Sequence, residues 1–283
     1  MKVLLTGASG QVGRALAASA PAGVVLVALG RDKLDIAAPG AAAEVVAEIA
    51  PDLILNAAAY TAVDRAESEP ALAMAINGTA VSRLAAAAAL SEARLVHIST
   101  DFVFDGRASN PYPPGAPTAP LSVYGRSKLA GEQAAGNALI VRTAWVYAAP
   151  GANFVHTMLR LMRTRDEVRV VADQIGTPTY AAGLADAIWA LSAAGASGIH
   201  HWTDSGAASW YDFALAIQEE ARAIGLLGRA VPVHPIPTSA YPTPARRPHY
   251  SVLDKSAATA IVGVAAHWRV NLRSMLKEIK ANG

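Results

Sequence analysis

The sequence contains no cysteine among its 283 residues. Disulfide bonds, thiolate metal sites and cysteine nucleophiles are therefore excluded. Charge is also sparse, since charged residues make up 16% of the chain and the formal net charge is only +2. An excess of basic residues this small and scattered does not indicate a nucleic-acid-binding surface, so we expect no nucleic-acid partner.

Long hydrophobic runs are lacking as well. No apolar run reaches the roughly 18 residues that span a bilayer. The first residues are one lysine, a short apolar run and a glycine turn, which is not typical of a signal peptide. We therefore expect a cytoplasmic protein with no membrane partner. The apolar content of 53% excludes disorder, and the length suits one large domain with an added lobe.

A glycine-rich turn follows the first hydrophobic segment. Residues 2–6 predict a buried strand, residues 7–13 read Gly-Ala-Ser-Gly-Gln-Val-Gly, and a helix is expected to follow. Glycines in this place permit a tight turn and a close approach of backbone to pyrophosphate, and the helix N-terminus then faces the phosphates. An ordinary strand–turn–helix unit is the alternative. We predict nucleotide binding, with contacts from Gly7, Ser9, Gly10, Gln11 and Val12.

Further hydrophobic runs at residues 24–28, 52–56, 95–101 and 138–143 predict an α/β fold with a Rossmann-type doubly wound parallel sheet. Arg31 follows the second strand, where NAD-specific folds usually place an acid. An arginine there can bind a 2′-phosphate, so NADPH is favoured, with NADH possible. A solvated arginine beside Asp32 is the alternative. The expected cofactor contacts continue with Asp35, Ile36, Asn56, Ala57, Ala58, Ala59 and Tyr60.

Tyr124 and Lys128 lie four residues apart in a segment of helical character, so their side chains share one face. A nearby ammonium stabilises a phenolate, and we expect Lys128 to lower the pKa of Tyr124 and make it a usable acid. Thr100 ends the fourth strand, where its hydroxyl can hold the substrate oxygen that Tyr124 protonates. Tyr124 and Lys128 are also expected to contact the cofactor. His97 is interpreted as a strand residue rather than a catalytic group.

The regular βα alternation loosens after residue 146. We expect residues 61–67 to form a cap and helix start, a helix at 153–165, a turn and helix cap at 173–179, and a strand at 198–202. Residues 231–250 are proline-rich and basic and predict a stiff, irregular segment over a substrate. Trp145 and Tyr147 are expected to wall a pocket or to join the core. His200 and His201 point to opposite faces of a strand, which argues against a metal site.

These motifs together resemble the extended short-chain dehydrogenase/reductase family and, within it, the dTDP-4-dehydrorhamnose reductases. The likeness covers nearly the whole chain. The stretches that carry it are residues 7–13, 56–64, 99–106, 124–132, 142–147, 153–154, 173–179 and 247–254. The first half is typical of the superfamily, whereas residues 173–179 and 247–254 indicate the subfamily.

The resemblance implies a Rossmann domain at residues 1–146 plus 179–206 and a smaller α/β sugar-nucleotide lobe at 147–178 plus 207–283. It implies NADPH-dependent reduction of the C4 ketone of dTDP-4-dehydro-L-rhamnose, a dTDP-linked 4-keto-6-deoxy sugar, to dTDP-L-rhamnose. The implied catalytic residues are Thr100, Tyr124 and Lys128. Those implied at the substrate are Val63, Asp64, Thr100, Asp101, Trp145 and Arg247.

Two positions depart from the family pattern. Some members dimerise through a metal held by an acid directly after the glycine motif, where this chain has Arg14 and Ala15. We therefore expect no metal and a monomer or weak homodimer. The usual Asn before the C-terminal serine is Tyr250 here, so the substrate pocket is expected to differ in detail.

Two other functions stay open at this point. One is a related nucleotide-sugar 4-ketoreductase, epimerase or dehydratase. Dehydratases of the family follow the active-site Thr-Asp with Glu, whereas position 102 is Phe. The other is a regulatory subunit that binds NADP without turnover, against which the presence of Thr100, Tyr124 and Lys128 argues.

Overall fold

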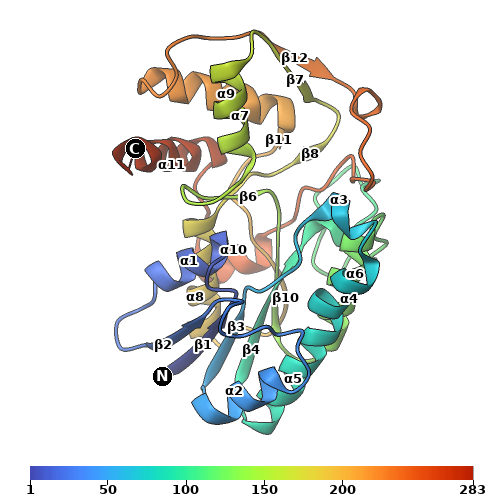
Figure 1. Cartoon of the computed structure of the whole chain (residues 1–283), viewed down its shortest axis with the longest axis vertical. Coiled ribbons are helices and arrows are strands. Elements are labelled where there is room, and N and C mark those ends of the chain that lie inside the picture. Colours follow the sequence, from blue (N-terminus) through green and yellow to red (C-terminus); the bar gives the residue numbers. More distant parts are fainter. Residues whose placement is uncertain (283) are drawn as a thin grey trace.

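Six parallel strands form the central sheet of this computed structural model, which describes residues 1–282. The spatial order of the strands is β10-β5-β4-β3-β1-β2, so the chain starts on an interior strand, forms one edge with β2, and then crosses to the other edge. The predicted doubly wound parallel sheet is confirmed (Figure 1). Its strands are β1 (Lys2–Thr6), β2 (Val25–Leu29), β3 (Leu53–Asn56), β4 (Arg94–Thr100), β5 (Leu139–Thr143) and β10 (Gly198–His201).

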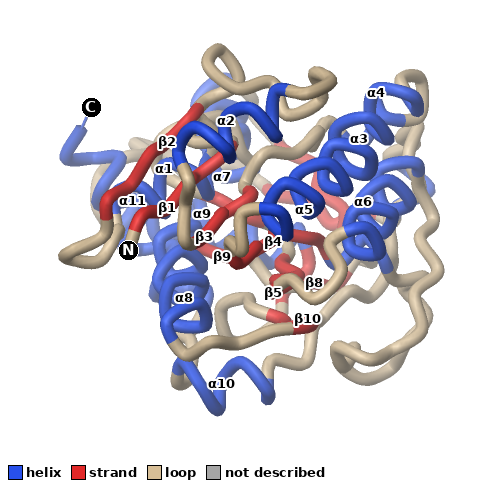
Figure 2. Tube along the Cα trace, turned by 90° about the horizontal axis from the view of Figure 1, so that it is seen from below, coloured by secondary structure: helices blue, strands red, loops and turns tan. Residues whose placement is uncertain are grey.

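Helices cover both faces of this sheet, as Figure 2 shows for α8 and α5. Alternate side chains of β1 point to opposite faces: Val3 and Leu5 pack with α1 and α8, and Leu4 packs with α2 and α5. Burial on both faces explains why the strands read as continuous hydrophobic runs. The covering helices are α1 (Gln11–Ala18), α2 (Ala41–Ile49), α5 (Ala80–Leu90), α6 (Val123–Ala134), α8 (Ala181–Ala193) and α10 (Ser256–Val262).

One helical run, Pro70–Leu90, is long and apolar enough by length and composition to cross a membrane, and 44% of its most apolar window is buried. The sequence alone did not predict such a run, because polar residues interrupt it. It consists of α4 (Pro70–Met74), a π-helical turn (Ala75–Thr79) and α5. Val81 and Leu84 pack on the sheet, as in the core helix of a globular domain. A membrane assignment therefore has only weak support.

The second hydrophobic core lies above the sheet in Figure 1, in a lobe built on three helices. These are α7 (Phe154–Thr164), α9 (Trp210–Ala223) and α11 (Trp268–Asn282). Asn153 caps α7, and Ser209 with Asp212 forms a capping box on α9. The lobe also holds the parallel pair β7 (Val168–Val171) and β12 (Val233–Ile236), and the short pairs β6 (Val146–Tyr147) with β9 (Thr179–Tyr180) and β8 (Ile175–Gly176) with β11 (Ala208–Ser209).

Four local predictions need correction. The turn expected at 173–179 contains β8 and the start of β9, and the irregular segment at 231–250 contains β12 and a 3₁₀ turn (Thr238–Ala240). Pro235 is tolerated because β12 pairs with β7 in a sheet of only two strands. The helix α3 (Val63–Ala66) has no side-chain cap. In addition, α10 returns to the sheet, since Ala258 is buried in that core, so residues 256–262 do not belong to the lobe.

Candidate active site

The glycine turn opens into a hollow of about 240 Å³ at the C-terminal edge of the sheet. Gly7 has a φ of +67°, and a Cβ on it would stand 2.5 Å from the backbone nitrogen of Ala58. Only glycine therefore lets the turn lie against the chain that follows β3. The hollow is lined by most of the predicted cofactor residues: Gly7, Ser9, Gly10, Arg31, Asp35, Ile36, Ala57, Ala58 and Ala59, together with Ile76.

Arg31 lies at the rim of this hollow with its side chain 73% exposed. Its guanidinium stands 3.7 Å from the carboxylate of Asp35, a weak surface pair. The arginine is therefore free to turn toward an anionic group in the hollow.

Three other predicted cofactor residues are not among those that line this hollow. Asn56 is 1% exposed, and its amide is bonded to Thr6, Ala58 and His97, so its side chain holds the turn from beneath rather than facing a ligand. Tyr60 is held through its backbone by the side chain of Asn77. Val12 packs against the sheet core from α1.

Gln11, in the first turn of α1, connects the glycine turn to the lobe. Its side-chain oxygen accepts a hydrogen bond from Asn153 Nδ2 at 2.9 Å. The same Asn153 caps α7 by accepting from the backbone of His156. Asn153 thus ties the glycine turn to the first helix of the lobe. Its place at the predicted start of that helix was its only signal in the sequence.

Tyr124 lies in the first turn of α6, whose N-cap Ser122 accepts from the backbone of Gly125. The phenol is 9% exposed and packs edge-on against Phe102, with ring centroids 5.5 Å apart. Val63 and Tyr60 complete this cluster. Burial raises the pKa of Tyr124 to about 12, while a hydrogen bond with Thr100 acts in the opposite direction. Thr100 and Tyr124 are neighbours in the structure, and the Thr100 hydroxyl donates its own hydrogen bond to Asp101 Oδ1 at 3.0 Å.

Lys128, one turn later, is 2% exposed. Its Nζ donates to the carbonyl of Ile98 at 2.6 Å and lies 3.3 Å from Nε2 of His97. Burial lowers the pKa of Lys128 to about 8. The net lowering of the Tyr124 pKa that we expected from Lys128 is not found, because burial of the phenol prevails and Nζ of Lys128 is directed at Ile98 and His97.

Asp101 follows Thr100 directly and is 1% exposed. Burial raises the pKa of its carboxyl to about 6, against the hydrogen bond that Thr100 donates to Oδ1 at 3.0 Å and the nearby hydroxyl of Ser251. Its Oδ2 atom has no hydrogen-bond partner in the described part of the chain. Ser251 comes from the predicted C-terminal signature, so this contact joins the end of β4 to residues 247–254.

The predicted substrate residues Asp64 and Arg247 contact each other. Arg247 donates to both carboxylate oxygens of Asp64, at 3.0 and 2.8 Å, and this interaction lowers the pKa of Asp64. Arg247 also borders a hollow of about 340 Å³ whose walls are largely apolar. Residues that line it include Phe154, Met158, Gln174, Trp210 and Tyr241.

The two aromatics after β5 separate in the structure. Tyr147 is 1% exposed and belongs to the lobe core, whereas Trp145 is half-buried and stacks on Trp210 with centroids 3.5 Å apart. Trp145 has a φ of +48°, a strained conformation for a bulky residue. A Cβ on Gly176 would stand 2.7 Å from its indole. Trp210, which fixes this indole, was not predicted, because its sequence pattern is that of any helix start.

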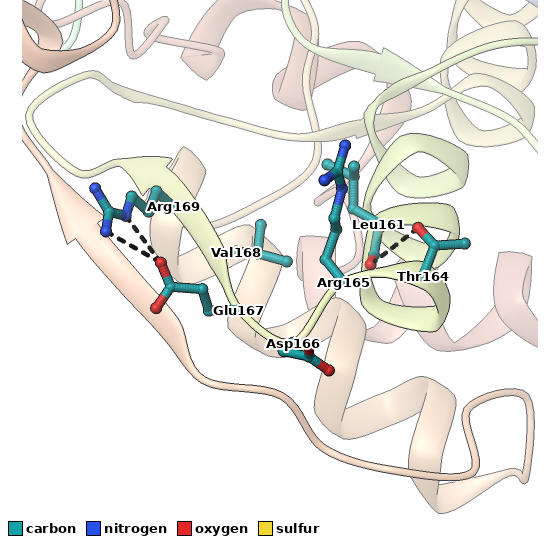
Figure 3. A pocket seen from close by; sticks show the side chains of 7 residues that line it. All are labelled: Leu161, Thr164, Arg165, Asp166, Glu167, Val168 and Arg169. Atoms are coloured by element: carbon teal, nitrogen blue, oxygen red, sulfur yellow. Dashed lines mark hydrogen bonds and ion pairs between the residues drawn. The ribbon is translucent and has the colours of Figure 1, made fainter.

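A larger hollow lies elsewhere, on the surface of the lobe (Figure 3). It measures about 570 Å³ and is lined by residues 161 and 164–169, none of which belongs to the predicted site. Three of its four charged residues are in ion pairs, Glu167 with Arg169 at 3.1 Å and Asp166 with Arg229. We therefore assign the active site to the two smaller hollows, which are lined by predicted cofactor and substrate residues. Among residues 1–282, no group of three or more His, Asp or Glu side chains is placed to hold a metal ion.

Comparison with known proteins gives one consistent result. The model of the RmlD substrate binding domain family matches residues 1–281. A dTDP-4-dehydrorhamnose reductase of Burkholderia thailandensis is 48% identical over 285 residues, which covers 95% of this chain and 96% of the relative.

Two solved structures agree with this likeness. A dTDP-4-dehydrorhamnose reductase of Clostridium acetobutylicum superposes with a TM-score of 0.93 at 38% identity and covers 99% of this chain and 100% of its own. That of Bacillus anthracis, in complex with NADP, has a TM-score of 0.92 at 37% identity, with coverages of 98% and 99%.

Proposed function

We propose, because the chain belongs to the dTDP-4-dehydrorhamnose reductase family, that it catalyses the NADPH-dependent reduction of the C4 ketone of dTDP-4-dehydro-L-rhamnose to dTDP-L-rhamnose. The observation that supports this most directly is the place of Tyr124. Its phenol is in contact with Thr100 and packs beside Tyr60, next to the cofactor hollow, and Val63, next to Asp64. A proton donor thus stands between the two regions that would hold the two reactants.

The glycine turn fits a dinucleotide. The space that a Cβ on Gly7 would fill is closed by backbone, so the turn presents main-chain atoms to the hollow, at the N-terminus of α1. Gly10 and Ser9 would contact the pyrophosphate, and Arg31 the 2′-phosphate. When bound, NADPH supplies the hydride that the ketone carbon receives.

Tyr124 would donate its proton to the oxygen that becomes the C4 hydroxyl, and Thr100 would hold that oxygen in line with the phenol. A developing alkoxide is far more basic than a ketone, so it takes the proton even from a phenol whose pKa is raised. The charge of Lys128, one turn later on α6, would offset part of the cost of the phenolate that remains.

The dTDP part of the substrate would lie toward the lobe. Asp64 holds Arg247 through both Nη groups, and the edge of the guanidinium that carries Nε would meet a phosphate. Trp145 and Asp101 would border the sugar. All these groups come from one chain, so the site is complete in a monomer, and a weak homodimer would leave it unchanged.

The experiment that tests this function follows NADPH oxidation with dTDP-4-dehydro-L-rhamnose and identifies the product by NMR. We expect one NADPH consumed for each dTDP-L-rhamnose formed. A protein that is purified with stoichiometric NAD and consumes no NADPH would instead be an epimerase or dehydratase. A protein that binds NADPH without turnover would be the regulatory subunit.

A further inference from the structure

His97, on β4, contacts two residues of the site although it lies wholly inside the protein. It is 0% exposed. Its Nδ1 lies 3.0 Å from Nδ2 of Asn56, and its Nε2 lies 3.3 Å from Nζ of Lys128. The imidazole therefore bridges the end of β3 and the Tyr–Lys helix.

The surroundings of Asn56 determine which nitrogen of His97 carries the proton. The oxygen Oδ1 of Asn56 accepts from the backbone N–H of Ala58 at 3.2 Å and from the hydroxyl of Thr6 at 2.7 Å. The backbone N–H of Ala58 can only donate, so the atom of the Asn56 side chain that faces it must be the oxygen. The side-chain amide of Asn56 therefore cannot be flipped. Its NH₂ group therefore faces His97, and Nδ1 of His97 must accept.

A neutral imidazole that accepts at Nδ1 carries its proton on Nε2. His97 is neutral because burial and the charge of Lys128 hold its pKa well below the usual range. The Nε2–H group consequently points at Nζ of Lys128. The Nε2–H group of His97 can donate to the lone pair of Lys128 Nζ when the lysine is a neutral amine. When the lysine is an ammonium, Nζ has no lone pair and both groups are donors, so no hydrogen bond forms between them.

The other groups around Lys128 do not reverse this preference. The carbonyl of Ile98 accepts from Nζ in either state. Glu132, on the same helix, favours the ammonium, but its carboxylate is already paired with Arg142 at 2.7 Å. Tyr124, a turn earlier, is protonated at neutral pH. Among the described contacts of Lys128 Nζ, His97 is thus the one titratable residue that does not lie on α6.

We propose that His97 is a positioning residue that holds Nζ of Lys128 in place and, by directing an N–H group at it, favours the amine over the ammonium. Lys128 then exchanges its proton in the range where the enzyme works, and the charge that supports the Tyr124 phenolate is lost on the alkaline side. This inference rests on the proposed function and adds a residue that controls its pH range.

Two substitutions separate the parts of this proposal. In His97→Gln, the side-chain amide reaches the place of Nε2 and can rotate to offer its oxygen to the ammonium. In His97→Asn, the amide reaches the place of Nδ1, so Asn56 keeps a partner while Lys128 loses one. Both remain polar and smaller than the imidazole, which limits the damage to the core.

The first measurement is the ¹⁵N NMR spectrum of histidine-labelled wild-type protein, with the His97 signals assigned by their loss in His97→Gln. We expect the Nε2–H tautomer from pH 6 to pH 9. The Nδ1–H tautomer would overturn the proposal, whether or not any variant folds and whether or not the protein has reductase activity.

The second measurement is the pH profile of kcat. We expect the alkaline limb of His97→Gln to move to higher pH by roughly one unit, the size of an ordinary environmental shift, and that of His97→Asn to move less. A merely structural role would lower kcat or Tm and leave the limb in place, which would contradict the proposal. Inactive wild-type protein would instead refute the proposed function and leave the NMR result to decide the role of His97.

Discussion

Arg247 donates two hydrogen bonds to the carboxylate of Asp64, which lies 183 residues earlier in the chain. The pair joins α3, beside the sheet, to the loop that leads out of the lobe. It is only partly exposed, with side-chain exposures of 23% and 40%. Because Arg247 lowers the pKa of Asp64, the ion pair is present above the usual carboxyl pKa and is lost only as the pH falls through the lowered value.

Replacing Arg247 by Ala should weaken substrate binding more than cofactor binding. A charge-assisted hydrogen bond is worth about 1.5–3 kcal/mol, so we expect KM for the dTDP sugar to rise about 10- to 100-fold. The Kd of NADPH should stay near that of the wild type. Steady-state kinetics with Arg160→Ala, an exposed arginine on α7, as the charge-matched control would check this. Equal KM values for the two variants would argue against a phosphate contact.

Arg31 should determine the preference for NADPH over NADH. Arg31→Ala removes the cation at the rim of the hollow, and we expect Kd for NADPH to rise about tenfold or more while Kd for NADH changes little. Fluorescence titration with both nucleotides measures this directly. Lys33→Ala, exposed on the same loop, is the control. An unchanged ratio of the two affinities in Arg31→Ala would show that the arginine is merely solvated.

Gly176 should matter for the substrate through Trp145. In Gly176→Ala the new methyl group would stand 2.7 Å from the indole, which would have to leave its stack on Trp210. We expect a higher KM for the dTDP sugar and a changed tryptophan fluorescence spectrum, with NADPH binding retained. Gly228→Ala, where a Cβ meets open space, should change neither. Wild-type KM in Gly176→Ala would remove Trp145 from the substrate site.

The buried pair of Glu132 and Arg142 should be important for stability. Their side chains are 4% and 2% exposed, and Arg142 also donates to the carbonyl of Pro114 in the loop beside Tyr124. Glu132→Gln leaves a buried guanidinium without its counter-ion, so we expect a loss of about 3–5 kcal/mol in urea unfolding. Glu167→Gln, which breaks the exposed pair with Arg169, should cost less than about 1 kcal/mol. Similar losses would contradict this difference.

The sheet, the glycine turn and the Tyr–Lys helix were predictable because each depends on residues that are neighbours in sequence. Residues 2–13 contain a strand, a turn and a helix start in one local pattern. The supporting contacts were not predictable, since they join distant segments: Asn77 with Tyr60, Asn153 with Gln11, and His97 with Lys128. Each of these polar residues reads in the sequence as an ordinary helix or strand residue, and only packing shows its partner.

The same reasoning explains the errors. The expected effect of Lys128 on Tyr124 followed from their helical spacing, but spacing does not show that Nζ of Lys128 lies against Ile98 and His97. The return of α10 to the sheet was missed because Ala258 gives no sign of which core buries it. Burial and long-range pairing, rather than local propensity, determined these outcomes.

The most direct test of the proposed chemistry is the turnover of Tyr124→Phe with NADPH and dTDP-4-dehydro-L-rhamnose, measured beside the NADPH affinity of the same variant. The phenylalanine preserves the packing against Phe102 but has no proton to give. We predict a kcat about 10²- to 10⁴-fold below that of the wild type, with an unchanged Kd for NADPH. Near-normal turnover by Tyr124→Phe would contradict the assignment of Tyr124 as the proton donor.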